Sequence, residues 1–377
     1  MQSNKHIYEL INLCKKGDIN SFRKFYTEHQ EEINLSAYNE KLFRIACKNG
    51  YSDIVKQIYE WNPNINISAD GECAFREACS SGRLNIIQQL YEWKPTLNIS
   101  IYDDCAFRGA CANGHLHIIK QLYEWRPKIN ISAMNEWALI ESCRNGHHHI
   151  IRQLYEWRPT INISVSKDYA FRIACRNGHL DIIRQLYEWC PTIDISTDNE
   201  WAYRYACENG HLHIIKQLYE WKPDISISVD NEYAFKFACV NGHLNVIRQL
   251  YEWKPTIDIY TNNQYAFKWA CLAGHLHIVK QLYEWDTSAD INTILTRHVI
   301  PKNVRDYLIN IKNSKNNSWI SNIVSADNTS FECSICRGDD LKEYVETPCH
   351  HIYCQLCIKT WMERSTVCPY CRKDLLN

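Results

Sequence analysis

Apolar residues recur along the chain with a helical period inside a longer repeat. Residues 198–223 form one unit, whose first apolar stripe falls at i, i+4 spacing on Ala202, Tyr203, Ala206 and Cys207. Asp198 or Asn199 can cap the start of this predicted helix, and Gly210 suits a left-handed cap at its end. A second stripe over 211–221 predicts a second helix, which Pro223 ends. The pattern therefore predicts a helix–turn–helix unit followed by an extended connector.

This unit repeats every 32 residues. The repeat is marked by glycines at Gly50, Gly82, Gly114, Gly146, Gly178, Gly210, Gly242 and Gly274. A cysteine lies three residues before each glycine, from Cys47 to Cys271, and a tryptophan lies eleven after it, from Trp61 to Trp285. A ninth, N-terminal copy keeps Cys14 and Gly17. One such unit cannot bury its own apolar face, so we expect about nine repeats to stack as a solenoid over residues 1–290.

The repeat motif is Ala-Cys-x-x-Gly-His-Leu-x-Ile-Ile-x-x-Leu, as seen over 174–186. It resembles the ankyrin repeat family over about residues 5–290, and in style the ankyrin proteins of large DNA viruses. The period is 32 rather than the family's 33, and residues 169–172 replace its Thr-Pro-Leu-His start. We therefore expect the helix pairs to be kept more faithfully than the β-hairpin fingers. A generic helical-repeat solenoid is the alternative.

The connectors vary from repeat to repeat, as in 102–104 and 134–136. The resemblance implies that this rim and the inner helices bind a protein partner, here an unknown protein substrate. Acidic residues recur in these connectors, so we expect a somewhat acidic rim.

Three rows of repeated residues allow a chemical or a structural interpretation. The repeated cysteine is expected to be a small core residue rather than a redox ladder. A basic row could bind phosphates or join neighbouring repeats: Arg44, Arg76, Arg108, Arg172, Arg204, Lys236 and Lys268. The histidine pairs, such as His115/His117 and His211/His213, could hold metal or lie on the surface. We favour the structural interpretation of each row, and for the basic row a formal net charge of −1 agrees with it.

Residues after the repeats predict a cap and a linker. Pro301 suits the first turn of a helix, so we expect a helical cap over 291–312 and a Ser/Asn-rich linker over 313–330. No signal peptide or membrane-spanning run is visible. We therefore expect an intracellular, cytoplasmic protein (of a host cell if the source is viral), with no membrane partner and no nucleic acid.

The final segment, 331–375, carries eight metal-ligand residues. They are Cys333, Cys336, Cys349, His351, Cys354, Cys357, Cys368 and Cys371. Eight thiolate and imidazole groups supply two tetrahedral zinc sites, so we predict two Zn²⁺ ions. A segment of this length buries too little surface to fold unaided, and metal binding then supplies the folding free energy.

The ligand order, three Cys, one His and four Cys, resembles the RING finger family. The resemblance implies interleaved sites, with Cys333, Cys336, Cys354 and Cys357 on one zinc and Cys349, His351, Cys368 and Cys371 on the other. It favours His351 over its neighbour His350. The predicted fold is mostly α, an ankyrin-like helical solenoid followed by a small zinc-stabilised α+β RING domain.

RING fingers most often act as ubiquitin ligases, so the resemblance implies a ubiquitin-conjugating enzyme and ubiquitin as partners. Ile335, Trp361 and Pro369 match the groove that docks the conjugating enzyme, and Arg372 matches the cation that contacts both partners. Catalysis would be positional, without a covalent ubiquitin intermediate. The alternatives are a non-enzymatic adaptor and a nucleic-acid-binding protein that uses the basic row.

Overall fold

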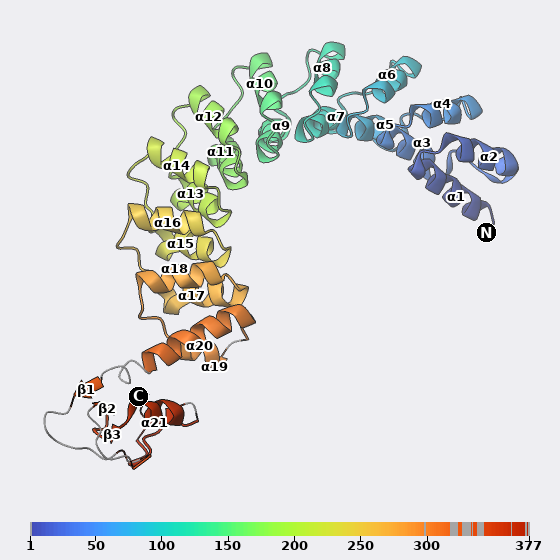
Figure 1. The fold of residues 1–377 in the computed structure, drawn as a ribbon. Coiled ribbons are helices and arrows are strands. Elements are labelled where there is room, and N and C mark those ends of the chain that lie inside the picture. Colours follow the sequence, from blue (N-terminus) through green and yellow to red (C-terminus); the bar gives the residue numbers. More distant parts are fainter. Residues whose placement is uncertain are drawn as a thin grey trace. The chain divides into compact units, whose positions relative to one another are not determined.

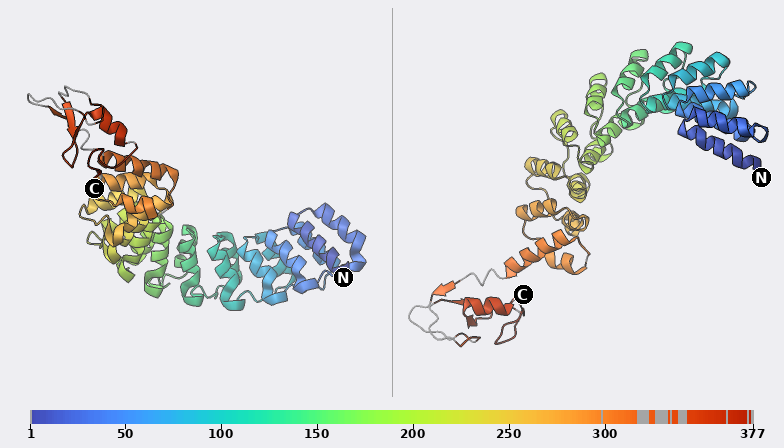
Figure 2. Two further views of the ribbon diagram at one scale, coloured as in Figure 1. Left: turned by 90° about the horizontal axis from the view of Figure 1, so that it is seen from below. Right: turned by 45° about the vertical axis from the view of Figure 1, so that its right-hand side comes forward.

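The computed structural model describes residues 2–297, 299–316, 323–325, 333, 335–337, 343–362, 364–373 and 375. The chain divides into two compact units, 1–234 and 235–377, which we describe separately. Within each unit, antiparallel helix pairs follow one another side by side (Figures 1 and 2). In the described part of the chain, every helix is too short or too polar to cross a membrane. The predicted mostly α, solenoid-like fold is confirmed.

Each repeat consists of a first and a second helix. The first helices are α1 (Gln2–Lys16), α3 (Ala37–Asn49), α5 (Ala69–Ser80), α7 (Ile101–Ala112), α9 (Ala133–Arg144), α11 (Val165–Asn177), α13 (Thr197–Glu208), α15 (Val229–Val240) and α17 (Thr261–Ala273). The second helices are α2 (Ile19–His29), α4 (Ser52–Trp61), α6 (Leu84–Trp93), α8 (Leu116–Trp125), α10 (His148–Trp157), α12 (Leu180–Trp189), α14 (Leu212–Trp221), α16 (Leu244–Trp253) and α18 (Leu276–Trp285). A short 3₁₀ turn, η1 (Gln30–Glu32), follows α2. The described connectors between the helix pairs contain no strand, so β-hairpin fingers are absent from them.

The predicted apolar stripes form the core of each unit. In one repeat, Ala206 and Cys207 of α13 and Ile214, Ile215 and Leu218 of α14 are fully buried. The equivalent cysteines from Cys47 to Cys271 are also buried, and burial raises their pKa values. A thiol that stays protonated is a poor nucleophile, which agrees with the core interpretation of this row.

The repeat glycine closes the first helix and makes room for the next repeat. Gly178 lies at φ +83°, and the N–H of His179 donates to Ala174 O at 3.0 Å, as a left-handed cap requires. A Cβ at Gly178 would lie 2.7 Å from Nδ1 of His211, which belongs to the following repeat. The glycine is therefore needed for both its backbone conformation and this close approach.

The histidine pairs join repeats rather than hold metal. Nε2 of His147 lies 3.0 Å from Ala112 O, and Nε2 of His149 lies 3.0 Å from Gly114 O. A carbonyl only accepts, so each ring N–H donates to the preceding repeat. His147 is half-buried, whereas His149 is exposed, as expected of a surface residue.

The connectors enter the first helices through a left-handed turn. Asp198, Asn199 and Glu200 lie at φ +54° to +58° inside the bounds of α13, so neither Asp198 nor Asn199 caps the helix as predicted. Asp198 instead pairs with Arg172 of the preceding repeat at 2.8 Å, and Arg204 donates to Asp198 O at 3.1 Å. These bonds help offset the cost of left-handed backbone, about 1–2 kcal/mol per residue. The basic row thus makes inter-repeat bonds, as favoured.

An acid at the third position of most turns is buried, whereas acids at the first two positions, such as Asp70, Asp103 and Asp230, are exposed as expected for the rim. Glu136 is 5% exposed and accepts bonds from Ser132 Oγ at 2.6 Å and from the N–H of Asn162, in the connector to the next repeat, at 3.2 Å. Within residues 1–234 the same place is held by Glu40, Glu72, Asp104, Asp168, Glu200 and Glu232. The exposed rim also presents Tyr102 and Met134.

The repeated tryptophan stacks on the tyrosine of the preceding repeat. The rings of Tyr155 and Trp189 lie 3.9 Å apart at an interplanar angle of 5°, and Tyr123 and Trp157 pair at 4.1 Å. Tyr26 of the N-terminal copy stacks on Trp61 in the same way. The row therefore contributes inter-repeat packing.

Two helices follow the last repeat within residues 235–377. They are α19 (Ile291–Arg297) and α20 (Lys302–Asn316), which extends four residues past the predicted end of the cap. Val304 and Leu308 of α20 are fully buried, and the ammonium of Lys280 in α18 lies 5.4 Å from the ring centroid of Tyr307. These helices cover the last repeat, in the role proposed for the cap.

The C-terminal domain has one small antiparallel sheet and one helix. Strands β1 (Ile323–Ser325), β2 (Glu343–Glu346) and β3 (Ile352–Tyr353) lie in that order, with Val324 opposite Tyr344 and Val345 opposite Tyr353. Helix α21 (Gln355–Met362) follows. Strand β1 falls within the segment predicted to be a linker, 313–330, which corrects that boundary. The remainder of that segment after 316 lies outside the described residues.

Candidate metal centre

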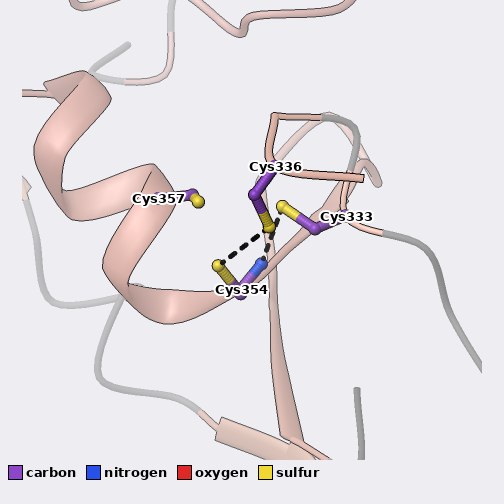
Figure 3. A group of neighbouring side chains, drawn as sticks. All are labelled: Cys333, Cys336, Cys354 and Cys357. Carbon is purple, nitrogen blue, oxygen red and sulfur yellow. Dashed lines mark hydrogen bonds between the residues drawn. The ribbon is translucent and has the colours of Figure 1, made fainter. Parts of the chain in front are cut away.

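The first ligand group is made from two sequence-distant Cys-x-x-Cys pairs. Cys333 and Cys336 lie in a turn before β2, whereas Cys354 and Cys357 lie at the start of α21. Their four sulfur atoms all lie within 4.8 Å of one another, with 3.9 Å between the Sγ atoms of Cys336 and Cys354 (Figure 3).

The second group combines the strand connection with the C-terminal turn. Cys349 and His351 lie between β2 and β3, and Cys368 and Cys371 lie after α21. Nδ1 of His351 is 3.4 Å from Cys349 Sγ and 3.7 Å from Cys368 Sγ. His350 stays outside the group, because its Nδ1 bonds Glu346 at 2.7 Å. The structure thus brings together the two sets that the RING resemblance implies.

The spacing of these atoms fits tetrahedral zinc. A Zn–S bond of about 2.3 Å places two sulfurs on one ion about 3.8 Å apart, and a Zn–N bond of about 2.0 Å gives an N–S separation near 3.5 Å. The separations of 3.9, 3.4 and 3.7 Å agree with these edges. Thiolate and imidazole ligands without carboxylate are also the donor set that zinc prefers. Each group can therefore hold one zinc ion.

Two ligand thiols lie where the backbone favours their charged form. Burial raises the pKa of Cys333, but N–H groups of Cys336, Cys354 and Ile335 outweigh it and bring the pKa to about 7. Burial likewise opposes ionisation of Cys368, and the Tyr353 hydroxyl with nearby N–H groups lowers its pKa to about 7. Since zinc binds thiolates, these sulfurs are partly prepared for the metal.

Two residues that support the ligands were missed by sequence reasoning. Thr347 is 2% exposed, and its hydroxyl lies 3.2 Å from Cys349 Sγ and 2.9 Å from the N–H of His351. Tyr353 is fully buried, and its hydroxyl lies 3.2 Å from Cys368 Sγ. Second-layer contacts of this kind orient metal ligands. The ligand spacing does not point to either residue. The sequence feature that could have found them is a polar side chain close to a ligand along the chain.

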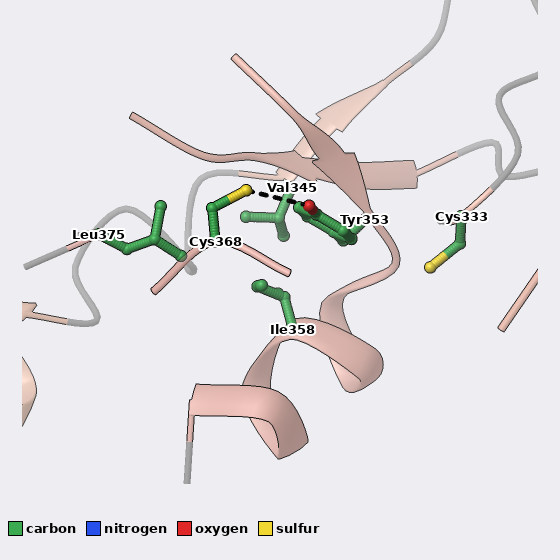
Figure 4. Close-up of a cluster of buried hydrophobic side chains, with 6 residues drawn as sticks. All are labelled: Cys333, Val345, Tyr353, Ile358, Cys368 and Leu375. Atoms are coloured by element: carbon green, nitrogen blue, oxygen red, sulfur yellow. Dashed lines mark hydrogen bonds between the residues drawn. The ribbon is translucent and has the colours of Figure 1, made fainter. Parts of the chain in front are cut away.

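A compact apolar core positions both groups. The buried residues are Cys333, Val345, Tyr353, Ile358, Cys368 and Leu375. Ile358 extends from α21 toward the strands that carry Val345 and Tyr353 (Figure 4). The core is small and includes two of the ligands, so its stability depends on the metal.

The residues expected to meet the conjugating enzyme lie around this core. Ile335 is half-buried against it, and Pro369 is also half-buried. Trp361 is 37% exposed, and its indole N–H donates to Val367 O at 2.9 Å. Arg372 is exposed at φ +59°, directly after the last ligand. That Ile335, Trp361 and Pro369 form one groove stays a prediction.

Comparison with known families agrees with both halves of this description. The family of ankyrin repeats (three copies) matches residues 107–199 and 203–294. The Ring finger domain family matches residues 331–372. The chain carries ankyrin repeats and a C-terminal RING finger. The two ligand groups are therefore the zinc sites of the RING finger, and the helix pairs are the ankyrin repeats of the chain.

Similar proteins match through the RING finger. RING finger protein 151 of Bos taurus is 44% identical over 52 residues, 14% of this chain and 21% of that protein. Postreplication repair E3 ubiquitin-protein ligase RAD18 of Kluyveromyces lactis is 44% identical over 45 residues, 12% of this chain and 10% of its own length. E3 ubiquitin-protein ligase RNF126 of Bos taurus is 41% identical over 49 residues, which are 12% of this chain and 16% of that protein. The match thus spans about a fifth or less of each relative.

Proposed function

We propose that this protein is a ubiquitin ligase whose RING finger positions a ubiquitin-charged conjugating enzyme. The observation that carries the proposal is the pair of interleaved zinc groups in a Ring finger match, with Trp361 and Arg372 exposed beside them. Two of the similar RING fingers belong to proteins named as E3 ubiquitin-protein ligases. The proposal places the protein in the cytoplasm.

The proposed chemistry is positional. All seven cysteines from Cys333 to Cys371 belong to the two zinc groups, which leaves no RING thiol to accept ubiquitin. Trp361 offers an aromatic surface for docking, the kind of side chain that often dominates binding energy. Arg372 offers a fork of N–H donors that can hold enzyme and ubiquitin together. Rate enhancement would come from orientation of the thioester.

The ankyrin repeats are proposed to recruit the protein substrate. Their exposed Tyr102 and Met134 offer apolar contacts on the rim, while Arg44, Arg172 and Arg204 of the basic row are engaged in bonds between repeats. Substrate binding and ubiquitin transfer would then lie on separate domains of one chain.

A self-ubiquitination assay tests the ligase proposal. Purified full chain is combined with activating enzyme, a panel of conjugating enzymes, ubiquitin and ATP. Trp361→Ala and Arg372→Ala are compared with Trp269→Ala and Arg152→Ala, which change an exposed Trp and an exposed Arg of the ankyrin repeats. We expect chains from the wild type and from both controls, and at least tenfold less from Trp361→Ala and Arg372→Ala.

Cys333→Ser serves as the folding variant, because it removes a ligand of the first zinc. If wild-type protein with two bound zincs made no chains across a broad panel, the ligase proposal would fail. The adaptor interpretation would then be preferred, and Trp361→Ala would abolish partner capture without any enzymatic loss.

A further inference from the structure

A cavity lies between the ends of two second helices in the N-terminal part of the solenoid. It has a volume of about 500 Å³ and is lined by Tyr91, Leu97, Ile99, Trp125, Arg126, Pro127 and Lys128. Tyr91 lies in the last turn of α6 and Trp125 ends α8, and their stacked rings, 4.2 Å apart, form one wall. Leu97 and Ile99 are 7% and 6% exposed and form the floor.

The lining of this cavity departs from the residue usual in the other repeats at the positions of Leu97 and Lys128. Leu97 replaces the isoleucine found at Ile65, Ile129, Ile161, Ile193, Ile225 and Ile257. Lys128 replaces the uncharged or acidic residue found at Asn64, Thr96, Thr160, Thr192, Asp224 and Thr256. Tyr91, Ile99, Trp125 and Pro127 keep the residue of the repeat, whereas the position of Arg126 varies and holds Asn62, Lys94, Arg158, Cys190, Lys222 and Lys254 in other repeats. Two side chains that line this cavity thus differ from those usual at the same positions in the other repeats.

The change makes the cavity positive. Arg126 and Lys128 are both exposed, and neither has an ion-pair or side-chain hydrogen-bond partner among the described residues. By contrast, the equivalent of Arg126 in the preceding repeat, Lys94, is half-buried and donates to Ser68 Oγ at 2.5 Å. No acid lines the cavity. Two available cations therefore flank an apolar floor.

We propose that this cavity binds an acidic peptide segment of a partner protein. One apolar side chain of the peptide would sit on Leu97 and Ile99 against Trp125, and flanking carboxylates would pair with Arg126 and Lys128. The volume is in the range of small-ligand pockets, about 300–1,000 Å³. This inference deepens the proposed substrate recruitment. Peptide binding by the cavity does not depend on the ligase proposal, but the role of the bound partner as a ubiquitination substrate does.

A peptide fits these observations better than a nucleic acid. Tyr91 and Trp125 each cover one face of the other, which reduces the surface on which bases could stack. The floor is aliphatic, and two available cations neutralise few phosphates. An apolar anchor between carboxylates matches both the floor and the charges.

Fluorescence polarisation with the full chain tests the proposal. The probe is a labelled peptide with a central phenylalanine between aspartates and glutamates. Its controls replace the acids by Asn and Gln, or the phenylalanine by serine. The double variant Arg126→Gln/Lys128→Thr removes both cations, and Lys222→Thr removes the equivalent of Arg126 three repeats further on.

We expect the acidic peptide to bind the wild type and Lys222→Thr equally, and both neutral and serine controls to bind at least tenfold more weakly. The double variant should lose about tenfold in affinity, and added salt should weaken wild-type binding. Equal binding by the double variant, equal binding of the neutral peptide, or preference for single-stranded DNA of matched length would overturn the proposal.

Self-ubiquitination separates this proposal from the ligase proposal. The double variant should retain wild-type self-ubiquitination, because its substitutions lie outside the RING finger. Conversely, Trp361→Ala should bind the peptide normally. The two proposals can therefore fail independently, because peptide binding tests one and self-ubiquitination tests the other.

Discussion

The buried acid found in most repeats joins each of them to the next, and Glu136→Ala tests how much that join contributes. Glu136 is 5% exposed and holds Ser132 Oγ at 2.6 Å and the N–H of Asn162 at 3.2 Å. Alanine also has a Cβ, so the strain at φ +59° is the same in both proteins. The variant leaves two part-buried donors without an acceptor, at about 1–3 kcal/mol each. Relief from burying a carboxylate offsets some of this, so we expect a net loss of about 2–4 kcal/mol.

The chain itself supplies the control. Gln264 holds the equivalent position in the last repeat, where its Oε1 accepts from the N–H of Asp290 at 3.0 Å. Glu136→Gln keeps such an acceptor and should cost less than about 1 kcal/mol.

Urea unfolding followed by far-ultraviolet circular dichroism measures both variants. Repeat arrays can unfold in segments, so the data are fitted with a nearest-neighbour scheme rather than a single transition. We expect Glu136→Ala to move or split the transition and Glu136→Gln to leave it close to wild type. An alanine variant within about 0.5 kcal/mol of wild type, or a glutamine variant as unstable as alanine, would refute the reasoning.

Three further predictions concern the zinc sites and the repeat turn. Tyr353→Phe removes the hydroxyl beside Cys368 Sγ and should weaken zinc binding about tenfold in a chelator competition, whereas an unchanged affinity would show that this contact does nothing for the metal. The pKa of Cys333, about 7, lies below the ordinary thiol value of 9.0, so the stabilisation of its thiolate is present at high pH and is lost as pH falls through about 7. Zinc affinity should therefore fall more steeply with pH below about 7 than between 7 and 9, and an equal slope in both ranges would contradict this. Gly178→Ala should destabilise the chain by about 1–3 kcal/mol, and adding His211→Ala should recover part of the loss if the close approach matters.

Local patterns predicted most of the secondary structure and the ligand inventory. Apolar spacing located the two helices of each repeat because helix formation and burial both follow a period of 3.6 residues. Gly210 was predicted to end a helix because a left-handed residue is needed there and glycine adopts it without strain. The eight zinc ligands were found from spacing alone, since a Cys-x-x-Cys turn brings two sulfurs to one metal.

The errors arose where a residue's partner lies in another repeat. Asp198 looked like a helix cap, but Arg172, 26 residues earlier, holds its carboxylate. The acid at Glu136 looked like part of a solvated rim, but the connector to the next repeat supplies an N–H to it. Residues 323–325 were assigned to a linker because segment 313–330 is rich in Ser and Asn, yet they pair with β2.

The sequence by itself thus determined the period, the helix pairs and the eight ligands, because each depends on residues within one turn or one repeat of each other. Only the tertiary structure decided which acids are buried, where the left-handed turns lie and which cations stay available at the cavity of Trp125. It also placed Tyr353 on a zinc ligand 15 residues away. These outcomes depend on stacking and strand pairing, which bring together groups whose separation along the chain carries no local signal.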